Sequence, residues 1–556
     1  MSDTRNNVPK FLKISCVLIV LIICSLSLLV ALEFMEYQKL QGQAETGTPT
    51  STNSSKNSSD VDGNNNTFEF NDTESGNPPA PSPLTLPDEI LNIPGSDVLD
   101  PSTPQYNASQ WLLYYDPANI DFEMDKTKVI QRFILASVYY NLEGAYWPQA
   151  EGWLGPRDEC SWYGIACNDQ NEIVRIVLVD DLLNGTFPVE IIELEKLEHL
   201  DLHNNNIGGP PPAALANLTH LKYLDMSGNA LVGDLPENLY NLTLLEHLNL
   251  ADNNLGGIIL PELGHLKSLK FLDLSANTFT GHCPAKYLYN LTLLEHLGVA
   301  ENNLEGTISS ELGLFESLTK LYMAENDFNG TLPTELGQLT LLESLHLHGN
   351  RLESNIPTEL GQLTALRELY LDNNRLVGPI PSELGELIKL EYLDLFDNFL
   401  TGDIPDTLSG LQEIMGIDIH NNTIKDEMPL FLFDFAKLED LILYDNDFSG
   451  RIPPEIGNAT ALVRLLLNNN MLNGVIPDEI DELKNLEELD LESNQFNDQI
   501  PDMLANLEKL RVFFIRNNFI TGEMPSSFCS LRSPNGSLEE LWADCEEVVC
   551  DCCTKC

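Results

Sequence analysis

Short runs of alternating apolar and polar residues recur along most of the chain with a fixed period. In the stretch LRELYLDNN (366–374), Leu369 and Leu371 alternate with polar residues, which predicts a short strand with one buried side. The asparagine that ends this stretch has counterparts from Asn205 to Asn518, and successive ones lie 24 residues apart, with a single step of 25. Asp181 occupies the same place in one earlier unit, which gives about fifteen units. A period of this length predicts a solenoid of stacked coils, each adding one parallel strand to a common sheet.

The residues that stay constant from unit to unit each have a structural role. Asn374 follows the strand, where its amide can satisfy backbone groups at the turn. Gly378 permits a backbone angle that other residues avoid, and Pro381 starts the return path with a fixed φ and no donor to satisfy. Because these positions build the frame, we expect any function to lie in the positions that vary.

The full repeat, L-x-x-L-x-L-x-x-N-x-L-x-G-x-I-P, resembles the plant-type class of leucine-rich repeats over roughly residues 125–545. The stretch CSWYGIAC (160–167) is similar to the N-terminal capping motif of that class, in which its two cysteines, Cys160 and Cys167, form a disulfide. The resemblance implies an α/β solenoid that is predominantly β. It would be a right-handed superhelix of about fifteen repeats, with short parallel strands on the concave face and a disulfide cap at each end.

A helix is predicted just before the capping motif. The stretch KVIQRFILASVYYNL (128–142) places Ile130, Phe133, Ile134 and Val138 on one helical face, as expected of a cap that covers the first coil. The predicted segments are a cytosolic tail (1–13), a transmembrane helix (14–32), a stalk (37–118), the N-terminal cap (119–172), the repeats (173–528) and a cysteine-rich C-terminal cap (529–556).

The apolar segment near the N-terminus predicts a single membrane span. Residues 14–32 carry no charge, and at about 1.5 Å per residue they form a helix of about 28 Å, close to the thickness of a bilayer core. Lys10 and Lys13 precede the segment, so the positive-inside tendency leaves residues 1–13 in the cytosol. We expect a single-pass plasma-membrane protein with its C-terminal ectodomain outside. The alternative is a cleaved signal peptide and a secreted protein.

Residues 37–118 are polar, rich in Asn, Ser, Thr and Pro, and without an apolar period, so we predict a disordered, glycosylated stalk. Sequons of the form Asn-x-Ser/Thr occur here and in the repeats, and they favour a surface glycoprotein. Asn421 is set aside because it lies beside a strand. The predicted glycosylation sites are Asn53, Asn57, Asn65, Asn71, Asn107, Asn184, Asn217, Asn241, Asn290, Asn329, Asn458 and Asn535.

Cysteines gather at the C-terminus, where an even set on an exported chain predicts a disulfide-tied cap. Six cysteines allow 15 pairings, and the sequence does not choose among them. A zinc thiolate cluster in CDCCTKC (550–556) is the alternative, although no histidine lies nearby. Cys283 is expected to be a buried free thiol. The predicted terminal disulfide cysteines are Cys529, Cys545, Cys550, Cys552, Cys553 and Cys556.

The formal net charge of −55 argues against a nucleic-acid partner, because no basic stripe is present to neutralise phosphates. Motifs of metalloproteases, serine hydrolases, nucleotide-binding enzymes and kinases are absent from the sequence. We therefore expect a protein that is not an enzyme and binds no cofactor. Any signalling is expected to pass through a membrane co-receptor.

The variable positions of the strands point outward on the concave face, and between Tyr322 and Tyr444 they become aromatic and rich in histidine. We expect Tyr322, His346 and Tyr370 to stack, with further rings continuing diagonally. Exposed aromatic rings beside acids can anchor a peptide or a sugar ring, or they can simply stabilise the sheet. The candidate ligand-binding residues are Tyr322, His346, His348, Tyr370, Asp372, Asp394, Phe396, Asp418, His420 and Tyr444.

Asp394 and Asp418 are expected side by side, where a calcium ion, a basic ligand or plain solvation would offset their repulsion. A zinc site at His346, His348 and Asp372 is disfavoured, and no metal site is predicted. The resulting expectation is a receptor-like or adhesive surface protein that recognises an extracellular peptide, protein or glycan ligand. A secreted inhibitor or cell-wall matrix protein is the alternative.

Overall fold

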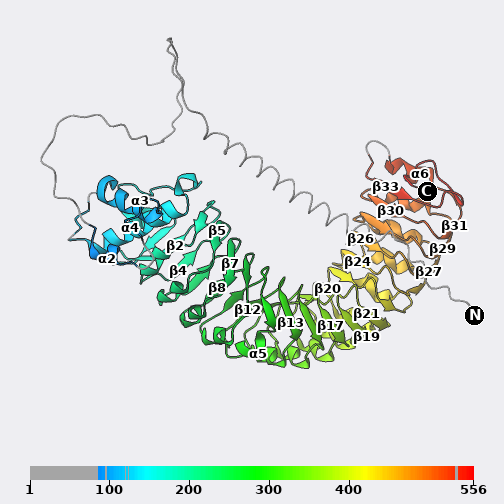
Figure 1. The fold of residues 1–556 in the computed structure, drawn as a ribbon. Coiled ribbons are helices and arrows are strands. Elements are labelled where there is room, and N and C mark those ends of the chain that lie inside the picture. Colours follow the sequence, from blue (N-terminus) through cyan, green and yellow to red (C-terminus); the bar gives the residue numbers. More distant parts are fainter. Residues whose placement is uncertain (1–85, 94–96, 119, 123, 533–535, 556) are drawn as a thin grey trace, which may run out of the picture. The chain divides into compact units, whose positions relative to one another are not determined.

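Each 24-residue unit forms one coil, and the coils stack into an arc whose inner side carries a 17-stranded sheet (Figure 1). The computed structural model describes residues 86–93, 97–118, 120–122, 124–532 and 536–555. From β2 onward every neighbouring pair of inner strands is parallel and in register, for example Leu345 with Leu369 and Leu369 with Leu393. These leucines are fully buried, so the solenoid predicted from the period is confirmed.

The inner strands are short because each coil crosses the inner side in only a few residues. They are β1 Ile165–Cys167, β2 Ile173–Val177, β4 His199–Asp201, β6 Tyr223–Asp225, β8 His247–Asn249, β10 Phe271–Asp273, β12 His296–Gly298, β14 Lys320–Tyr322, β16 Ser344–His346, β18 Glu368–Tyr370, β20 Tyr392–Asp394, β22 Gly416–Asp418, β24 Asp440–Ile442, β26 Arg464–Leu466, β28 Glu488–Asp490, β30 Val512–Phe514 and β33 Glu540–Trp542.

A second set of strands leaves each turn and pairs in smaller parallel sheets. They are β3 Asn184–Thr186, β5 Asn206–Gly209, β7 Ala230–Asp234, β9 Asn254–Gly256, β11 Thr280–His282, β13 Asn303–Thr307, β15 Asp327–Gly330, β17 Arg351–Ser354, β19 Arg375–Gly378, β21 Phe399–Gly402, β23 Thr423–Ile424, β25 Ser449–Gly450, β27 Met471–Gly474, β29 Gln495–Asp498 and β31 Phe519–Ile520.

The return path of each coil is a 3₁₀ segment that usually begins after the conserved proline. Pro381, for instance, precedes the segment Ser382–Glu386. The coil between Asn277 and Asn302 contains the extra residue, and there the return path is the α-helical turn α5, Ala285–Leu288. The 3₁₀ segments are Val189–Glu193, Ala213–Asn217, Glu237–Asn241, Pro261–His265, Ser310–Leu314, Thr334–Gln338, Thr358–Gln362, Ser382–Glu386, Asp406–Gly410, Leu430–Asp434, Pro454–Asn458, Asp478–Glu482 and Asp502–Asn506.

The repeated asparagine connects neighbouring coils through its side-chain amide. The Nδ2 of Asn374 donates to the carbonyl oxygen of Leu347 in the preceding coil at 3.0 Å, and also to Leu371 and Asp372 in its own coil. Its Oδ1 accepts from the backbone N–H of Leu352 at 2.9 Å, again in the preceding coil. The same pattern recurs from Asn205 to Asn518, so the predicted role of this residue at the turn is confirmed.

The N-terminal cap is larger than the sequence suggested. Its helix α4, Lys126–Asn141, buries Phe133, Ile134 and Val138, as predicted, while the fourth predicted residue, Ile130, is only partly buried against the core. The helix also buries Arg132, because residues before 119 cover its other side. The prediction of a disordered stalk over 37–118 therefore does not hold for residues 86–93 and 97–118, while residues 37–85 and 94–96 lie outside the described part of the chain.

Several contacts explain why this segment folds. It contains α3, Pro104–Gln110, which packs on α4, and the π-helical turn Trp111–Tyr115. The buried guanidinium of Arg132 lies 2.6 Å from the Asp116 carboxylate and contacts the rings of both Trp111 and Trp162. Farther upstream, α2, Asp88–Leu91, buries Ile90. The polar composition of the whole segment concealed these few buried residues.

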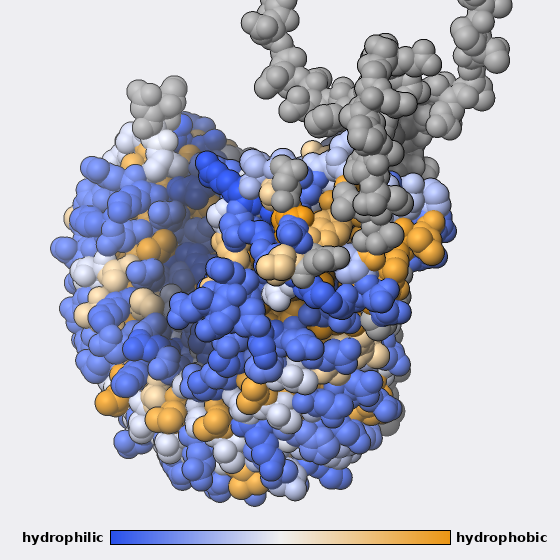
Figure 2. All heavy atoms as spheres, turned by 90° about the vertical axis from the view of Figure 1, so that its left-hand side faces the viewer, coloured by the Kyte–Doolittle hydropathy of each residue, from blue (hydrophilic) through white to orange (hydrophobic). Residues whose placement is uncertain are grey.

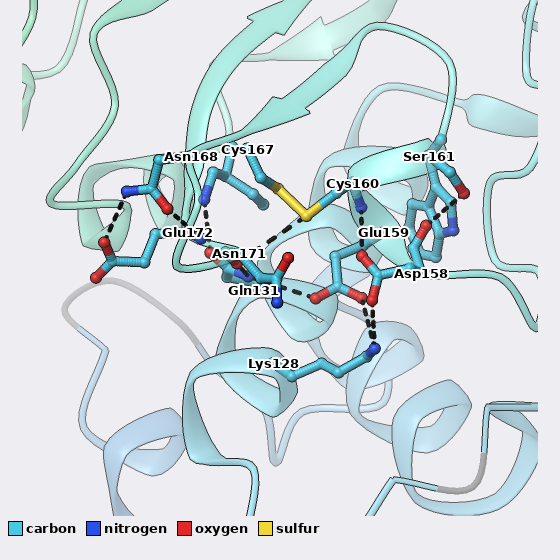
Figure 3. The surroundings of a disulfide bond; sticks show 12 residues. Lys128, Gln131, Asp158, Glu159, Cys160, Ser161, Cys167, Asn168, Asn171 and Glu172 are labelled. Atoms are coloured by element: carbon cyan, nitrogen blue, oxygen red, sulfur yellow. Dashed lines mark hydrogen bonds and ion pairs between the residues drawn. A yellow bond between two sulfur atoms is a disulfide. The ribbon is translucent and has the colours of Figure 1, made fainter.

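The disulfide between Cys160 and Cys167 closes the capping motif, as the resemblance implied. Figure 3 shows the polar network beside it, in which Lys128 lies 2.6 Å from Asp158 and the side chain of Gln131 reaches Glu159. Gln131 also accepts a hydrogen bond from the backbone N–H of Ile173, the first residue of β2. The network therefore fastens the capping helix to the first strand of the repeats.

The C-terminal cap is a final, degenerate coil tied by disulfides. It contains α6, Ser526–Cys529, the inner strand β33, and the pair β32, Gly522–Glu523, with β34, Val548–Val549. Cys529 is bonded to Cys552, Cys550 to Cys553, and Cys545 is also in a disulfide. These thiols are therefore oxidised and not arranged as a zinc cluster. Cys283 is buried and free, as predicted.

Several predictions fall outside the described residues. The apolar segment 14–32, four of the stalk sequons, Asn535 and Cys556 all belong to this group. Among the residues that the structure does describe, none of the helices has the length and apolar character needed to span a bilayer.

Replacing Asn374 with alanine should weaken the stack strongly. The change removes four hydrogen bonds at a buried position and leaves the N–H of Leu352 unpaired, so we expect a loss of about 3 kcal/mol in the free energy of unfolding. Urea unfolding followed by circular dichroism measures it. The control is Gln362→Ala, at an exposed position, which should stay within about 0.5 kcal/mol of the wild type. Equal effects of the two changes would contradict the role assigned to the asparagine.

Asp181 provides a pH-dependent test of the same arrangement. Its side chain is fully buried and neither carboxylate oxygen has a hydrogen-bond partner, so burial raises its pKa from 3.8 to about 6, helped by the charge of Asp180. Because the pKa is higher in the folded state, the carboxyl group stabilises the fold below about pH 4, and that stability is lost as the pH rises through 6. Asp181→Asn should therefore raise the unfolding temperature at pH 7.5 but not at pH 4.

The matched control is Asp180→Asn at the exposed neighbouring position. It should change the unfolding temperature at pH 7.5 far less than Asp181→Asn does. A gain for Asp181→Asn that is the same at both pH values would show that the buried charge is not its cause.

Candidate functional site: the inner face

Each inner strand presents three side chains on the open face of the sheet: those before, between and after its two buried leucines. We call these positions the first, second and third columns. In the coil of Leu200 and Leu202 they are His199, Asp201 and His203. Because the strands are in register, each column runs straight along the inner face from coil to coil.

The rings predicted to stack in the second column do so. The ring centroids of Tyr322 and His346 are 4.6 Å apart, and those of His346 and Tyr370 are 4.4 Å apart. His348, in the third column, lies against the same group, with its ring 6.2 Å from that of Tyr370. The Nε2 of His346 lies 3.0 Å from a carboxylate oxygen of Glu368, which fixes the orientation of the imidazole.

A second predicted group stacks in the third column. The centroid distances are 4.5 Å between Phe396 and His420 and 4.1 Å between His420 and Tyr444. Within the described residues no ring contact joins Tyr370 to Phe396, so the expected continuous ladder is in fact two ladders. All six rings are partly exposed, which leaves an edge or face of each open to a ligand.

Acidic side chains occupy the break between the two ladders. Asp394 and Asp418 are directly opposite each other on β20 and β22, as predicted. Asp418 is 2.6 Å from the Nδ1 of His420, and Asp372 accepts a hydrogen bond from Asn373. The side chain of Asp394 makes no ion pair or hydrogen bond with any residue that the structure describes. Burial, together with the charges of Asp418 and Asp372, raises the pKa of Asp394 to about 7.

The sequence analysis missed a longer stack in the first column. His199, Tyr223, His247, Phe271 and His296 follow one another on adjacent strands, with centroids 4.0–4.2 Å apart and rings within 14° of parallel. An edge-on contact between His296 and Tyr322 then connects this stack to the second column. The sequence does contain the signal: an aromatic or imidazole ring recurs at 24-residue or 25-residue spacing, directly before the first buried leucine of each of these strands.

A cluster of metal-binding side chains lies beside this stack. One ligand atom each of Asp201, His203 and Asp225 lie within 4.8 Å of one another. The combination of His346, His348 and Asp372, which the sequence analysis disfavoured, is not among the groups of described residues that come together in this way. The convergence at Asp201 could not be predicted from one column alone, because it joins the second and third columns of two coils.

The sequons of the described part lie mainly on exposed asparagines. Asn107, Asn217, Asn241, Asn290, Asn329 and Asn458 are exposed, and Asn184 is half-buried. Asn217, Asn241 and Asn458 each end a 3₁₀ segment and so share one place in their coils. Figure 2 shows that the outer surface near the N-terminal cap is predominantly hydrophilic, with separate hydrophobic spots. Glycosylation at these positions stays a prediction.

Comparisons with known proteins agree with the architecture. A family model described as leucine-rich repeats (2 copies) matches residues 195–241. A single-repeat model, described as leucine-rich repeat, matches residues 244–266, 317–339, 341–363, 365–387, 389–411, 437–459, 485–507 and 509–531.

Two receptors of Arabidopsis thaliana are similar in sequence over short segments. Receptor-like protein kinase 7 is 39% identical over 77 residues, and phytosulfokine receptor 1 is 33% identical over 89 residues. The matches cover 14% and 15% of this chain, and only 8% and 9% of those proteins. The chain therefore matches less than a tenth of the length of these relatives.

Solved structures match over much longer stretches. The Arabidopsis receptor kinase HAESA, solved with the peptide hormone IDA and the co-receptor SERK1, gives a TM-score of 0.66 at 31% identity, covering 71% of this chain and 66% of that one. The plant peptide hormone receptor RGFR1, solved with RGF2, gives 0.56 at 30%, covering 66% and 74%. A leucine-rich repeat protein of Leptospira interrogans gives 0.54 at 31%, covering 65% and 88%.

Proposed function

The chain belongs to the plant-type leucine-rich repeat proteins, and on that premise we propose that its inner face binds an extracellular peptide or protein segment. Binding would be non-catalytic and receptor-like. The observation that carries the proposal is a track of rings across the inner face, interrupted at one place by Asp394, a carboxyl group without a partner. Similar structures that were solved with peptide hormones support this choice of ligand.

The ring track runs diagonally across the face. It follows the first column up to His296, the second from Tyr322 to Tyr370 and the third from Phe396 to Tyr444. A stack needed only for stability would have no reason to change columns, since rings in one column already meet at the strand spacing. A diagonal track fits an extended ligand that crosses the strands at an angle and packs a side chain against each group of rings.

The break in the track selects the charge of the ligand. Asp372, Asp394 and Asp418 repel one another there, and burial together with the charges of Asp418 and Asp372 holds the pKa of Asp394 high. Arg464, whose charge acts on Asp394, is already held by the Asp440 carboxylate at 2.6 and 2.8 Å. A lysine or arginine side chain of the ligand would supply the missing positive charge, so we propose a ligand that is basic as well as aromatic or apolar.

We also propose that residues 14–32 anchor the protein in the plasma membrane with the repeats outside, and that a membrane co-receptor joins the ligand-bound state. The uncharged segment of nineteen residues and the preceding lysines support the anchor. The co-receptor in the HAESA complex supports the second part by similarity.

The ligand proposal is tested with arrays of synthetic basic, acidic and neutral peptides and of cell-wall oligosaccharides, probed with the purified full-length protein. Basic peptides that contain aromatic residues should be retained. Tyr322→Ala, Tyr370→Ala and Phe396→Ala should each weaken their binding about tenfold, because a partly buried aromatic contact contributes about 1–2 kcal/mol. Asp394→Asn should weaken only peptides that carry Lys or Arg.

The matched control is Phe399→Ala on β21, whose ring is 58% exposed outside the inner face and should not affect binding. Unchanged binding by ring variants that unfold at the wild-type temperature would remove the track from consideration. Binding of oligosaccharides alone would instead favour the cell-wall matrix function.

The membrane proposal is tested by sequencing the N-terminus of the mature protein from the membrane fraction of a eukaryotic host. Intact residues 1–36 are expected. A mature protein that starts near residue 45 and appears in the medium would show that the apolar segment is a signal peptide and would favour the secreted alternative.

A further inference from the structure

In the second column of the first coils, two buried carboxylates lie opposite each other. Asp201 and Asp225 lie directly opposite each other on β4 and β6, and their exposures are only 7% and 5%. Like charges opposite each other on adjacent strands are unfavourable, and burial increases the cost. Among the described residues, no lysine or arginine forms an ion pair with either carboxylate.

Imidazole groups face this pair from two sides. The Nδ1 of His203 is 2.7 Å from an Asp201 oxygen, and one ligand atom each of Asp201, His203 and Asp225 fall within 4.8 Å of one another. The Nε2 of His247 lies 3.7 Å from an Asp225 oxygen, which is beyond hydrogen-bond distance. That nitrogen is buried and has no hydrogen-bond partner. It lies within ion-pair distance of Asp225 without a hydrogen bond, so its lone pair can serve as a further ligand.

From this arrangement we propose that Asp201, His203 and Asp225 bind one divalent transition-metal ion of the zinc class, with His247 as a further ligand. Carboxylate oxygens with one or two imidazole nitrogens suit zinc, cobalt or manganese, whereas calcium and magnesium prefer oxygen ligands alone. The ion would add positive charge beside two buried carboxylates that pair with no lysine or arginine of the described residues.

The ring stack of the first column holds the site in shape. The ring of His247 lies between Tyr223 and Phe271, with centroids 4.1 and 4.2 Å away and planes within 14° of parallel. Ser227 and Asn249 donate hydrogen bonds to Asp225 at 2.6 and 3.0 Å, which fixes that carboxylate. Ligands held by packing and by outer hydrogen bonds are the normal support of a metal site. His247 belongs both to this site and to the first column of the ring track, but the binding of the ion is measured without any peptide ligand.

The test titrates the full-length protein, without a histidine tag, with Zn²⁺ by calorimetry and with Co²⁺ by visible absorbance. One ion per chain is expected, and the Co²⁺ spectrum should show nitrogen and oxygen ligands without a thiolate charge-transfer band. His203→Gln and Asp225→Asn should each weaken binding about tenfold or more. His348→Gln and Asp372→Asn, which change a histidine and an aspartate on the same face, should leave it unchanged.

Three results would overturn the proposal: no stoichiometric binding of Zn²⁺ or Co²⁺, equal affinity in the His203→Gln protein, or tighter binding of Ca²⁺ than of Zn²⁺. A thiolate band would assign the ion to cysteines instead. The stoichiometry, the preference for Zn²⁺ over Ca²⁺ and the Co²⁺ spectrum are all measured on the wild-type protein, so these three readouts do not depend on the stability of the variants.

Discussion

The side-chain amide of the repeated asparagine is the interaction on which the whole arc depends. A three-residue strand cannot hold a coil in place by itself, and no single coil can bury its own leucines. The amide solves this by bonding at once to carbonyl groups of two coils and to an N–H of the preceding one, as Asn374 does with Leu347, Leu371 and Leu352. Each coil is thereby fixed in register to its neighbour, and the leucines follow.

The series of hydrogen-bonded asparagines also accounts for the two ends of the solenoid. In the first repeat the place of the asparagine is taken by Asp181, whose carboxyl group has no hydrogen-bond partner in its buried site. At the other end Asp544 accepts a hydrogen bond from the N–H of Asn518, at 3.3 Å, and so terminates the series. Both ends are then closed by disulfides, one in the N-terminal cap and more than one in the C-terminal cap. The repeat pattern is therefore regular in the interior of the solenoid, and acidic residues and disulfides replace it only at the ends, where a neighbouring coil is missing.

A strict period made most of the fold predictable, while features without a period were not. The strands, the asparagine turn and the stacking of Tyr322, His346 and Tyr370 followed from repeat positions, and the capping disulfide from the resemblance of CSWYGIAC to a known motif. The folded segment around Trp111 and Asp116 did not, since its contacts with Arg132 join parts of the chain that share no pattern. The pairing of Cys529 with Cys552 likewise depends on how the last coil turns, which spacing alone leaves open.

The carboxylates of the inner face fall into two groups, those with an imidazole beside them and those without. On the early coils each acid has an imidazole near it: His203 for Asp201, His247 for Asp225 and His296 for Asp273. On the middle coils Asp394 has none, although His420 sits on the neighbouring Asp418. A frame that repeats every 24 residues imposes neither arrangement, because all these positions point away from the core. Imidazoles that can share a buried site with carboxylates favour a bound metal ion, whereas an acid left without a partner between rings favours a cation brought by a ligand. The two halves of one regular surface are thus suited to different chemistry, and the difference arises entirely from side chains that the fold leaves free to vary.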